Sequence, residues 1–115
     1  MSSFRIEGGH QLKGEITPQG AKNEALQILC AGLLTPETVT IHNMPNIRDV
    51  NKLIELLGSL GVEVNQLSDS SYSFTAANVN IDYLHTANFR KQASALRGSI
   101  MIMGPLLARY GKASI

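Results

Sequence analysis

Hydrophobic and polar positions alternate at the start of the chain and then change to a helical spacing. Phe4–Gly8 and Leu12–Thr17 alternate apolar with polar side chains, which is typical of short strands, and Gly8-Gly9 between them indicates a turn. Pro18 ends the second of these patterns. From Ala21 to Leu33, apolar residues recur every three or four positions, and this spacing predicts a helix.

Strands and helices are expected to alternate through the middle of the chain. Val39–Ile41 is typical of a strand. A helix with one apolar face should begin near Asn46, whose side chain can accept hydrogen bonds from first-turn amides. It should end before Gly61, a residue suited to a left-handed cap. Val62–Asn65 and Tyr72–Thr75 then predict a hairpin around a polar loop.

The last third of the chain predicts another helix and the beginning of a strand. The helix should cover Asn88–Met103 and be interrupted by Gly104-Pro105, because proline lacks the amide hydrogen. Lys112–Ile115 is typical of the start of a strand. Ala31–Leu34 and Gly104–Leu107 are similar segments 73 residues apart, which suggests repeated units. The order of elements predicts an α/β (α+β) fold with helices packed on a mixed sheet.

The composition is that of one folded domain in a reducing compartment. The chain has 115 residues, of which 43% are hydrophobic, so it can bury enough apolar surface to fold. Only 17% are charged, against about 25% in most proteins, which suggests that another surface covers part of this one. Cys30 is the lone cysteine, and the sequence has neither a membrane-length apolar run nor a signal sequence. A soluble, cytoplasmic protein is therefore expected.

The net charge of +1 argues against a strongly basic nucleic-acid-binding protein, but the charge is unevenly distributed. Residues 1–82 carry five basic and nine acidic side chains, whereas residues 83–115 carry five basic and no acidic ones. This basic third could attract anions, or it could be an ordinary solvated helix face. A freestanding α/β module that binds an anion or RNA is therefore one hypothesis for the function.

The most informative candidate site lies where the first helix is expected to begin. Free amides and the helix dipole favour an anion at such a place, and Gly20 lets the chain turn into it. Lys22 adds a positive charge, and Asn23 offers a donor and an acceptor for a hydroxyl group. Glu24 would offset part of this charge, and the spacing of a P-loop is absent. The alternative is a solvated surface lysine.

Arg97 is the second candidate, because it stands in an apolar helical segment. A guanidinium group there needs an anionic partner, which could be a substrate phosphate or a structural ion pair. Arg48 and Asp49 are interpreted as surface charges or as a capping pair. Cys30 lies among apolar residues and is expected in the core. The histidines lack the spacing of metal ligands, so no metal site is expected. They are His10, His42 and His85.

Two spaced motifs resemble the UDP-N-acetylglucosamine enolpyruvyl transferase family. The first is Gly20-Ala21-Lys22-Asn23, and the second is Leu96–Ile100 followed by Gly104–Gly111. Three further segments fit: Phe4–Gly8, Leu12–Ile16 and Leu56–Val64. The resemblance thus covers essentially the whole chain.

The resemblance implies an inside-out barrel fold built from repeated β-α-β-α-β-β units. Residues 19–82 would form the first unit, residues 83–115 would begin a second, and the strands in residues 1–18 would pack with another domain. The family's reactive loop, which carries a cysteine or an aspartate, would lie beyond Ile115. No catalytic residue is therefore expected in this chain, which should be inactive alone and should self-associate through exposed strand edges.

The resemblance also implies a reaction and its substrates. The family transfers the enolpyruvyl group of phosphoenolpyruvate to the 3-hydroxyl of UDP-N-acetylglucosamine, with release of phosphate, by addition and elimination without a metal or organic cofactor. This step begins peptidoglycan synthesis. Lys22 and Asn23 match phosphoenolpyruvate-binding residues, and Asn23 and Arg97 match residues that bind the sugar nucleotide. Arg48 is a weaker electrostatic candidate. The related shikimate-pathway transferase, or a structural or regulatory role, is an alternative.

Overall fold

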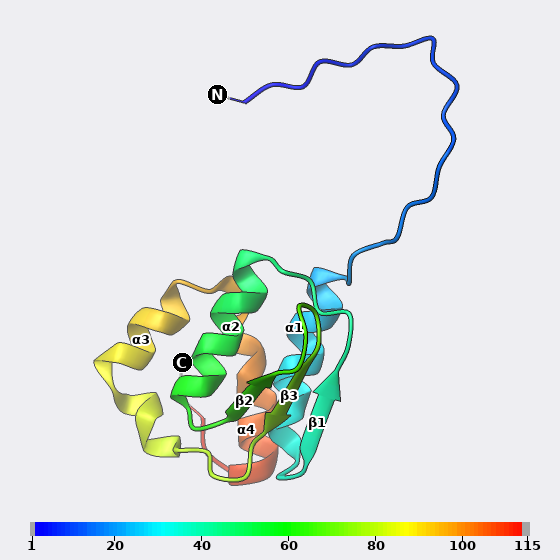
Figure 1. The fold of residues 1–115 in the computed structure, drawn as a ribbon. Helices are drawn as coiled ribbons and strands as arrows, with labels where there is room; N and C mark the ends of the chain where they lie inside the picture. The colour runs from blue at the N-terminus through cyan, green and yellow to red at the C-terminus, as the bar shows by residue number, and fades with distance from the viewer. Residues whose placement is uncertain (1, 114–115) are drawn as a thin grey trace.

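The computed structural model describes residues 2–113, which form an extended N-terminal arm and a layered body (Figure 1). Residues 2–20 contain no helix or strand. The body contains, in chain order, α1 (Lys22–Ala31), the 3-10 helix η1 (Gly32–Leu34), β1 (Thr38–Ile41), α2 (Arg48–Ser59), β2 (Glu63–Gln66), β3 (Tyr72–Thr75), η2 (Ile81–His85), α3 (Ala87–Ser94), η3 (Arg97–Ile102) and α4 (Met103–Tyr110).

The sheet has three strands, with β3 between β1 and β2. β3 is antiparallel to both neighbours, so the predicted hairpin of β2 and β3 is confirmed. The predicted mixed sheet is wrong, because no parallel pair occurs within residues 2–113. Phe74 lies opposite Val39 on one side and Val64 on the other, and it is buried. These apolar residues share one face of the sheet, since residues paired directly across antiparallel strands point to the same side.

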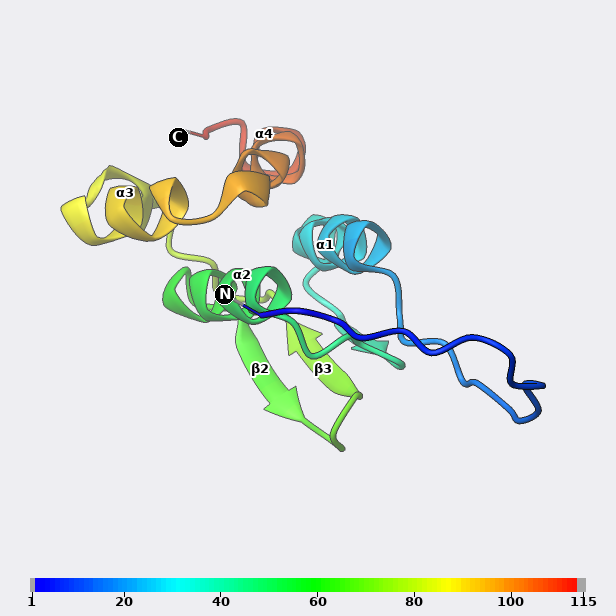
Figure 2. The ribbon, with the colours of Figure 1, turned by 90° about the horizontal axis from the view of Figure 1, so that it is seen from above.

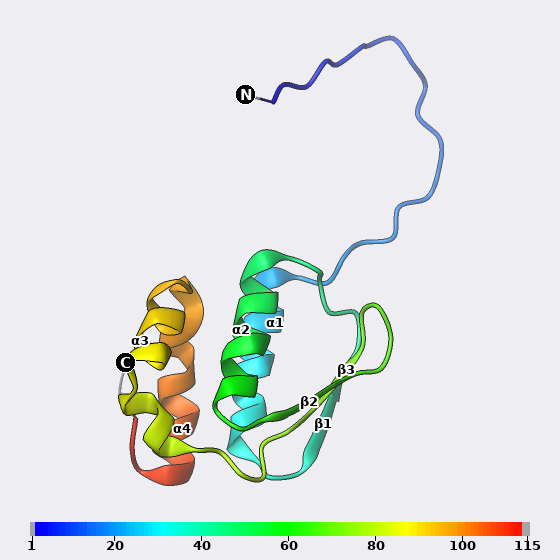
Figure 3. The ribbon, with the colours of Figure 1, turned by 60° about the vertical axis from the view of Figure 1, so that its left-hand side comes forward.

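The helices form two layers on one side of this sheet. Figures 2 and 3 show α1 and α2 side by side next to the sheet, and α3, η3 and α4 beyond them. The side chains with less than 2% exposure come mainly from the helices: Leu33, Val50, Leu53, Leu56, Leu57, Leu60, Phe89, Ile102 and Leu106. The central helix α2 therefore supplies much of the core, as its apolar pattern predicted.

Both ends of α2 can be compared with the sequence. Asn46 was predicted to cap its first turn, but the N-cap residue is Ile47, which makes no side-chain cap. The Asn46 side chain instead accepts a hydrogen bond from Asn51. The prediction for Gly61 is confirmed, since its φ is +102°. The amides of Gly61 and Val62 donate to the carbonyls of Gly58 and Leu57, which is the Schellman pattern of helix ends.

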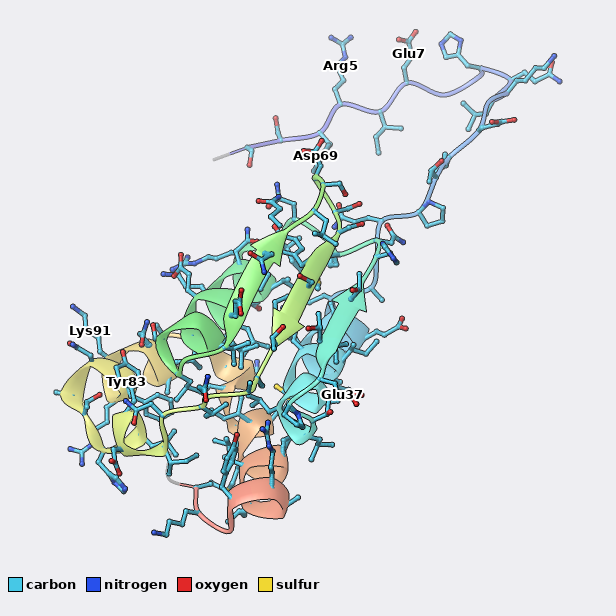
Figure 4. The ribbon with its side chains drawn as sticks, turned by 60° about the horizontal axis from the view of Figure 1, so that its bottom comes forward. Arg5, Glu7, Glu37, Asp69, Tyr83 and Lys91 are labelled. Atoms are coloured by element: carbon cyan, nitrogen blue, oxygen red, sulfur yellow. The ribbon has the colours of Figure 1, made fainter. Side chains whose placement is uncertain are left out.

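The arm contradicts the first prediction of the sequence. The strands expected over Phe4–Gly8 and Leu12–Thr17 do not form in residues 2–20, where no neighbouring strand is available for backbone hydrogen bonds. Its large apolar side chains are at least 90% exposed: Phe4, Ile6, Leu12 and Ile16. Figure 4 shows Arg5 and Glu7 pointing away from the body.

The last third of the chain also differs from its prediction. The single helix expected over Asn88–Met103 is divided into α3 and η3, which are separated at Ala95 and Leu96. Gly104-Pro105 does not interrupt a helix but lies in the first turn of α4. Proline is tolerated there, because first-turn amides have no hydrogen-bond acceptor within their own helix and the missing amide hydrogen therefore costs no helix bond. Lys112 and Ala113 form no strand, and residues 114–115 of that prediction lie outside the described residues.

Candidate functional site

Three elements begin at the same end of the body, and each begins with a basic residue. Lys22 is the first residue of α1, Arg48 of α2, and Arg97 of η3. Figures 1 and 3 show these three starts at the end of the body where the arm departs. Arg97 was expected inside an apolar helix, but it is exposed at the start of η3, because the predicted helix is divided there.

Two contacts connect these three starts. The Lys22 ammonium nitrogen Nζ lies 2.6 Å from Oδ2 of Asp49, so an ion pair joins the first turns of α1 and α2. A side-chain Cβ at Gly98 would lie 3.5 Å from Leu26, which is one turn after Lys22. Gly98 directly follows Arg97, so the start of η3 packs on the N-terminal half of α1.

The helix starts attract anions through their backbones as well. The N-cap residues Ala21 and Ile47 make no side-chain cap. The first-turn amides of α1 and α2 therefore donate no hydrogen bond to the side chain of an N-cap residue. By contrast, Thr86 caps α3 by accepting from Phe89 at 3.2 Å. Each uncapped end carries roughly half a positive charge, so two such ends together amount to about one.

Acidic side chains reduce this potential without reversing it. Lys22, Arg48 and Arg97 are the basic residues of the three starts, and Glu24 and Asp49 are the acidic residues in the first turns of α1 and α2. The side chains of Lys22 and Asp49 are 51% and 38% exposed. The site is therefore an open, mildly positive surface that a solute can reach.

The backbone that leads into α1 passes very close to another segment. A Cβ on Gly20 would overlap the carbonyl oxygen of Asn43 and lie 3.1 Å from Cδ of Pro45. Asn43 itself adopts a left-handed conformation, with φ of 57°. Only glycine therefore fits at Gly20, and this close approach positions the first turn that carries Lys22.

Two hollows lie beside the helix starts. One of about 120 Å³ is lined by Gly20, Glu24, His42 and their neighbours. The other, of about 640 Å³, is polar and is lined by Gln19, Asn43, Met44, Asn46, Asn51, Gln66, Asp69, Ser70 and Tyr72. Lys22, Asn23 and Arg97 line neither of them. All three residues are nevertheless exposed.

Other predicted residues have structural roles or lie elsewhere. Cys30 is buried in the core, as predicted, and burial raises the pKa of its thiol to about 11, so it is a poor nucleophile at neutral pH. The basic third does not form one continuous surface. Arg109 donates to the carbonyl of Leu33 at 2.9 Å and lies over the Tyr110 ring, whereas Lys91 lies on α3 at the far edge of the body (Figure 4).

Asp49 is the site residue that sequence reasoning missed. It was interpreted as a surface charge or a capping residue, yet it is the ion-pair partner of Lys22. No local pattern indicates this pair, because the two residues are on different helices. The useful signal is that both stand in the first turn of a helix, and α1 and α2 begin at the same end.

Comparison with known families identifies the class of protein. Residues 6–115 match the family described as EPSP synthase (3-phosphoshikimate 1-carboxyvinyltransferase). This match covers nearly all of the chain, and the chain therefore belongs to that family. The mixed helix-and-sheet body is consistent with such a domain.

Individual relatives carry a more particular name. A protein of Bacteroides fragilis, named UDP-N-acetylglucosamine 1-carboxyvinyltransferase, is 60% identical over all 115 residues. Proteins of the same name from Bacteroides thetaiotaomicron and Porphyromonas gingivalis are 57% and 51% identical, over 100% and 98% of this chain. The chain spans 26% of the length of each of these relatives. The predicted resemblance is thus confirmed.

Within residues 2–113, no helix has the length and apolar character needed to cross a membrane.

Proposed function

We propose that this chain supplies part of the substrate site of a transferase that moves an enolpyruvyl group from phosphoenolpyruvate to UDP-N-acetylglucosamine. One observation carries the proposal. Lys22, Asn23 and Arg97 stand at neighbouring uncapped or exposed helix starts in a chain that is 60% identical to a protein named for this activity. The resemblance of the motifs around these residues supports the same assignment.

The charges of the substrates explain why such a surface would be used. Phosphoenolpyruvate and the diphosphate of a sugar nucleotide are both polyanions and repel each other, so fixed positive charge is needed to bring them together. In the proposal, Lys22 and the first-turn amides of α1 hold phosphoenolpyruvate, and Asn23 contacts both substrates. Arg97 binds the sugar nucleotide, and Arg48 adds positive potential without direct contact.

The reaction itself is an addition followed by an elimination. The 3-hydroxyl of the sugar gives up its proton as its oxygen forms a bond to C2 of phosphoenolpyruvate, and the C2–C3 double bond opens as C3 takes up a proton, which gives a tetrahedral intermediate. Loss of inorganic phosphate from C2 and of a proton from C3 restores the double bond. Cations around the leaving phosphate favour this loss, because they offset the charge that collects on its oxygens. Neither a metal nor an organic cofactor is needed in this scheme.

The decisive experiment compares two lysines of the same chain. Phosphate release from phosphoenolpyruvate, with UDP-N-acetylglucosamine as acceptor, would be measured in the longest natural polypeptide that contains this chain. Lys22→Ala should lower kcat/KM by about 10²- to 10³-fold, the usual effect of removing one such donor. The matched control is Lys52→Ala, which removes an exposed lysine from α2 and should leave kcat/KM unchanged.

Stability measurements separate a binding role from a structural one. Lys22 is half-exposed, and its ion pair is of a kind that contributes up to about 1 kcal/mol, so Lys22→Ala should lower the melting temperature only slightly. Equal losses of activity and stability would contradict the proposed role of Lys22. Equal effects of Lys22→Ala and Lys52→Ala on activity would contradict it as well.

A second acceptor deserves a direct test, because the matching family is described by a different one. The family description names 3-phosphoshikimate. The same assay with 3-phosphoshikimate in place of UDP-N-acetylglucosamine should give no phosphate release. Turnover with 3-phosphoshikimate alone would replace the proposed substrate with that of the shikimate pathway, and salt-sensitive RNA binding without turnover would favour a binding module instead.

The 115 residues alone are proposed to be inactive and to associate with one another. They span 26% of the length of the relatives named for the activity, and the reactive loop of the resemblance lies outside them. The arm exposes four large apolar side chains, and β1 and β2 each have a free edge in the described sheet. Light scattering of the isolated chain should show a dimer or larger assembly, whereas a monomer at high concentration would contradict this.

The proposed location of the enzyme is the cytoplasm.

A further inference from the structure

We propose that Asp49 is the resident counterion of Lys22 and is exchanged for an anionic group of the substrate when that substrate binds. Asp49 is thus a positioning residue that acts through Lys22, and the proposal rests on the proposed function. Its basis is the ion pair at 2.6 Å between the first turns of α1 and α2.

The position of Asp49 determines where the ammonium group of Lys22 points. Lys22 has a long flexible side chain on the first residue of α1, and the carboxylate of Asp49 directs it across to the start of α2. The ammonium group is therefore held between two uncapped helix ends, where backbone amides also favour an anion. A phosphate or carboxylate that binds there must share or replace the contact with Asp49.

Exposure makes this exchange easy. Both partners are in contact with solvent, and exposed ion pairs of this kind contribute little to stability. The cost of breaking the pair therefore lowers the affinity for an incoming anion by about fivefold at most. The remaining negative charge of Asp49 also repels that anion at short range. Asp49 thus lowers anion affinity while it keeps Lys22 in a defined position.

The experiment measures the affinity of inorganic phosphate, by calorimetry, in the longest natural polypeptide that contains this chain. Asp49→Asn removes the charge at nearly constant shape and should tighten phosphate binding about three- to tenfold. Asp49→Glu keeps the charge and should bind phosphate as the unmodified protein does. Glu55→Gln is the matched control, since it removes an exposed acid from the same helix and should leave the affinity unchanged.

Two further measurements separate this role from a general change in charge. In a Lys22→Met background, the gain from Asp49→Asn should fall by at least half, because the exchange requires the ammonium group. In steady-state kinetics, Asp49→Asn should lower the KM for phosphoenolpyruvate, because the competing negative charge is removed. It should not raise kcat, because Lys22 loses its fixed position.

Unchanged or weaker phosphate binding in Asp49→Asn would overturn the proposal, as would an equal gain in Glu55→Gln. Failure of the proposed function would be recognised separately. In that case the unmodified polypeptide would show no turnover with phosphoenolpyruvate and UDP-N-acetylglucosamine, whereas the phosphate affinities would still report on Asp49.

Discussion

Gly20→Ala is the substitution that most directly tests how the backbone positions the candidate site. Gly20 stands two positions before the first residue of α1, and a Cβ there would overlap the carbonyl oxygen of Asn43. It would also lie 3.1 Å from Cδ of Pro45, so it has a second close neighbour. Neither neighbour is the end of a flexible side chain, and the backbone itself would have to move.

The expected cost follows from the nature of this overlap. Overpacking of a well-fitted site costs about 1–3 kcal/mol, and a backbone carbonyl as the obstacle places Gly20→Ala in the upper part of that range. With urea m-values of about 1–3 kcal/mol/M, the midpoint of unfolding should fall by roughly 1 M. In the longest natural polypeptide that contains this chain, displacement of the first turn of α1 should also lower the kcat/KM of the proposed transferase reaction, by about 100-fold for a shift near 1 Å.

A matched glycine substitution separates the overlap from the mere addition of a methyl group. Gly104 is exposed in the first turn of α4, and no atom lies within 4 Å of a Cβ built there. Gly104→Ala should therefore unfold at the same or a higher urea concentration, since alanine favours a helix by up to about 1 kcal/mol over glycine. If Gly20→Ala had the same urea midpoint of unfolding as Gly104→Ala and kept full activity, the close approach to Asn43 would not position the site.

Three further predictions concern the body and its core. Leu53→Ala should destabilise the protein by about 2–5 kcal/mol in urea unfolding, because Leu53 is fully buried on the central helix α2. Thr86→Ala removes the side-chain cap of α3 and should cost about 1 kcal/mol in the same assay, whereas an unchanged midpoint would contradict the role of the cap. Burial raises the pKa of Cys30 from 9.0 to about 11, which favours the neutral thiol in the folded protein. The contribution of Cys30 to stability should therefore be constant below pH 9.0 and decrease as pH rises from 9.0 toward 11, and a Cys30→Ser variant should lose less stability than the unmodified protein over that interval.

The elements of the body were predicted well where the sequence signal is local. The apolar stripe of α2 and the left-handed cap at Gly61 depend on residues a few positions apart, and both are present. The strand at Tyr72–Thr75 was predicted with its observed bounds. Such features follow from spacing and from the conformational freedom of glycine, which any reader of the sequence can see.

The arm shows why a strand pattern alone is insufficient. Alternation in Phe4–Gly8 describes how side chains would be arranged if backbone partners were available, but it does not supply those partners. The division of the expected helix at Ala95 and Leu96 has a similar origin. Helical spacing continues through these residues, yet η3 turns so that Gly98 packs on Leu26 of α1, a contact that depends on the packed body.

The candidate site combines both kinds of information. Its parts were visible in the sequence, because a basic residue at the start of a helix is a local feature, as Lys22 shows. Their arrangement was not visible, since it depends on α1, α2 and η3 all beginning at one end of the body. The ion pair with Asp49 depends on that arrangement, and it changes the role expected of Lys22. In the proposed site, Lys22 would bind an anion by exchange with Asp49, so the affinity for that anion would be set by the difference between two ion contacts rather than by one.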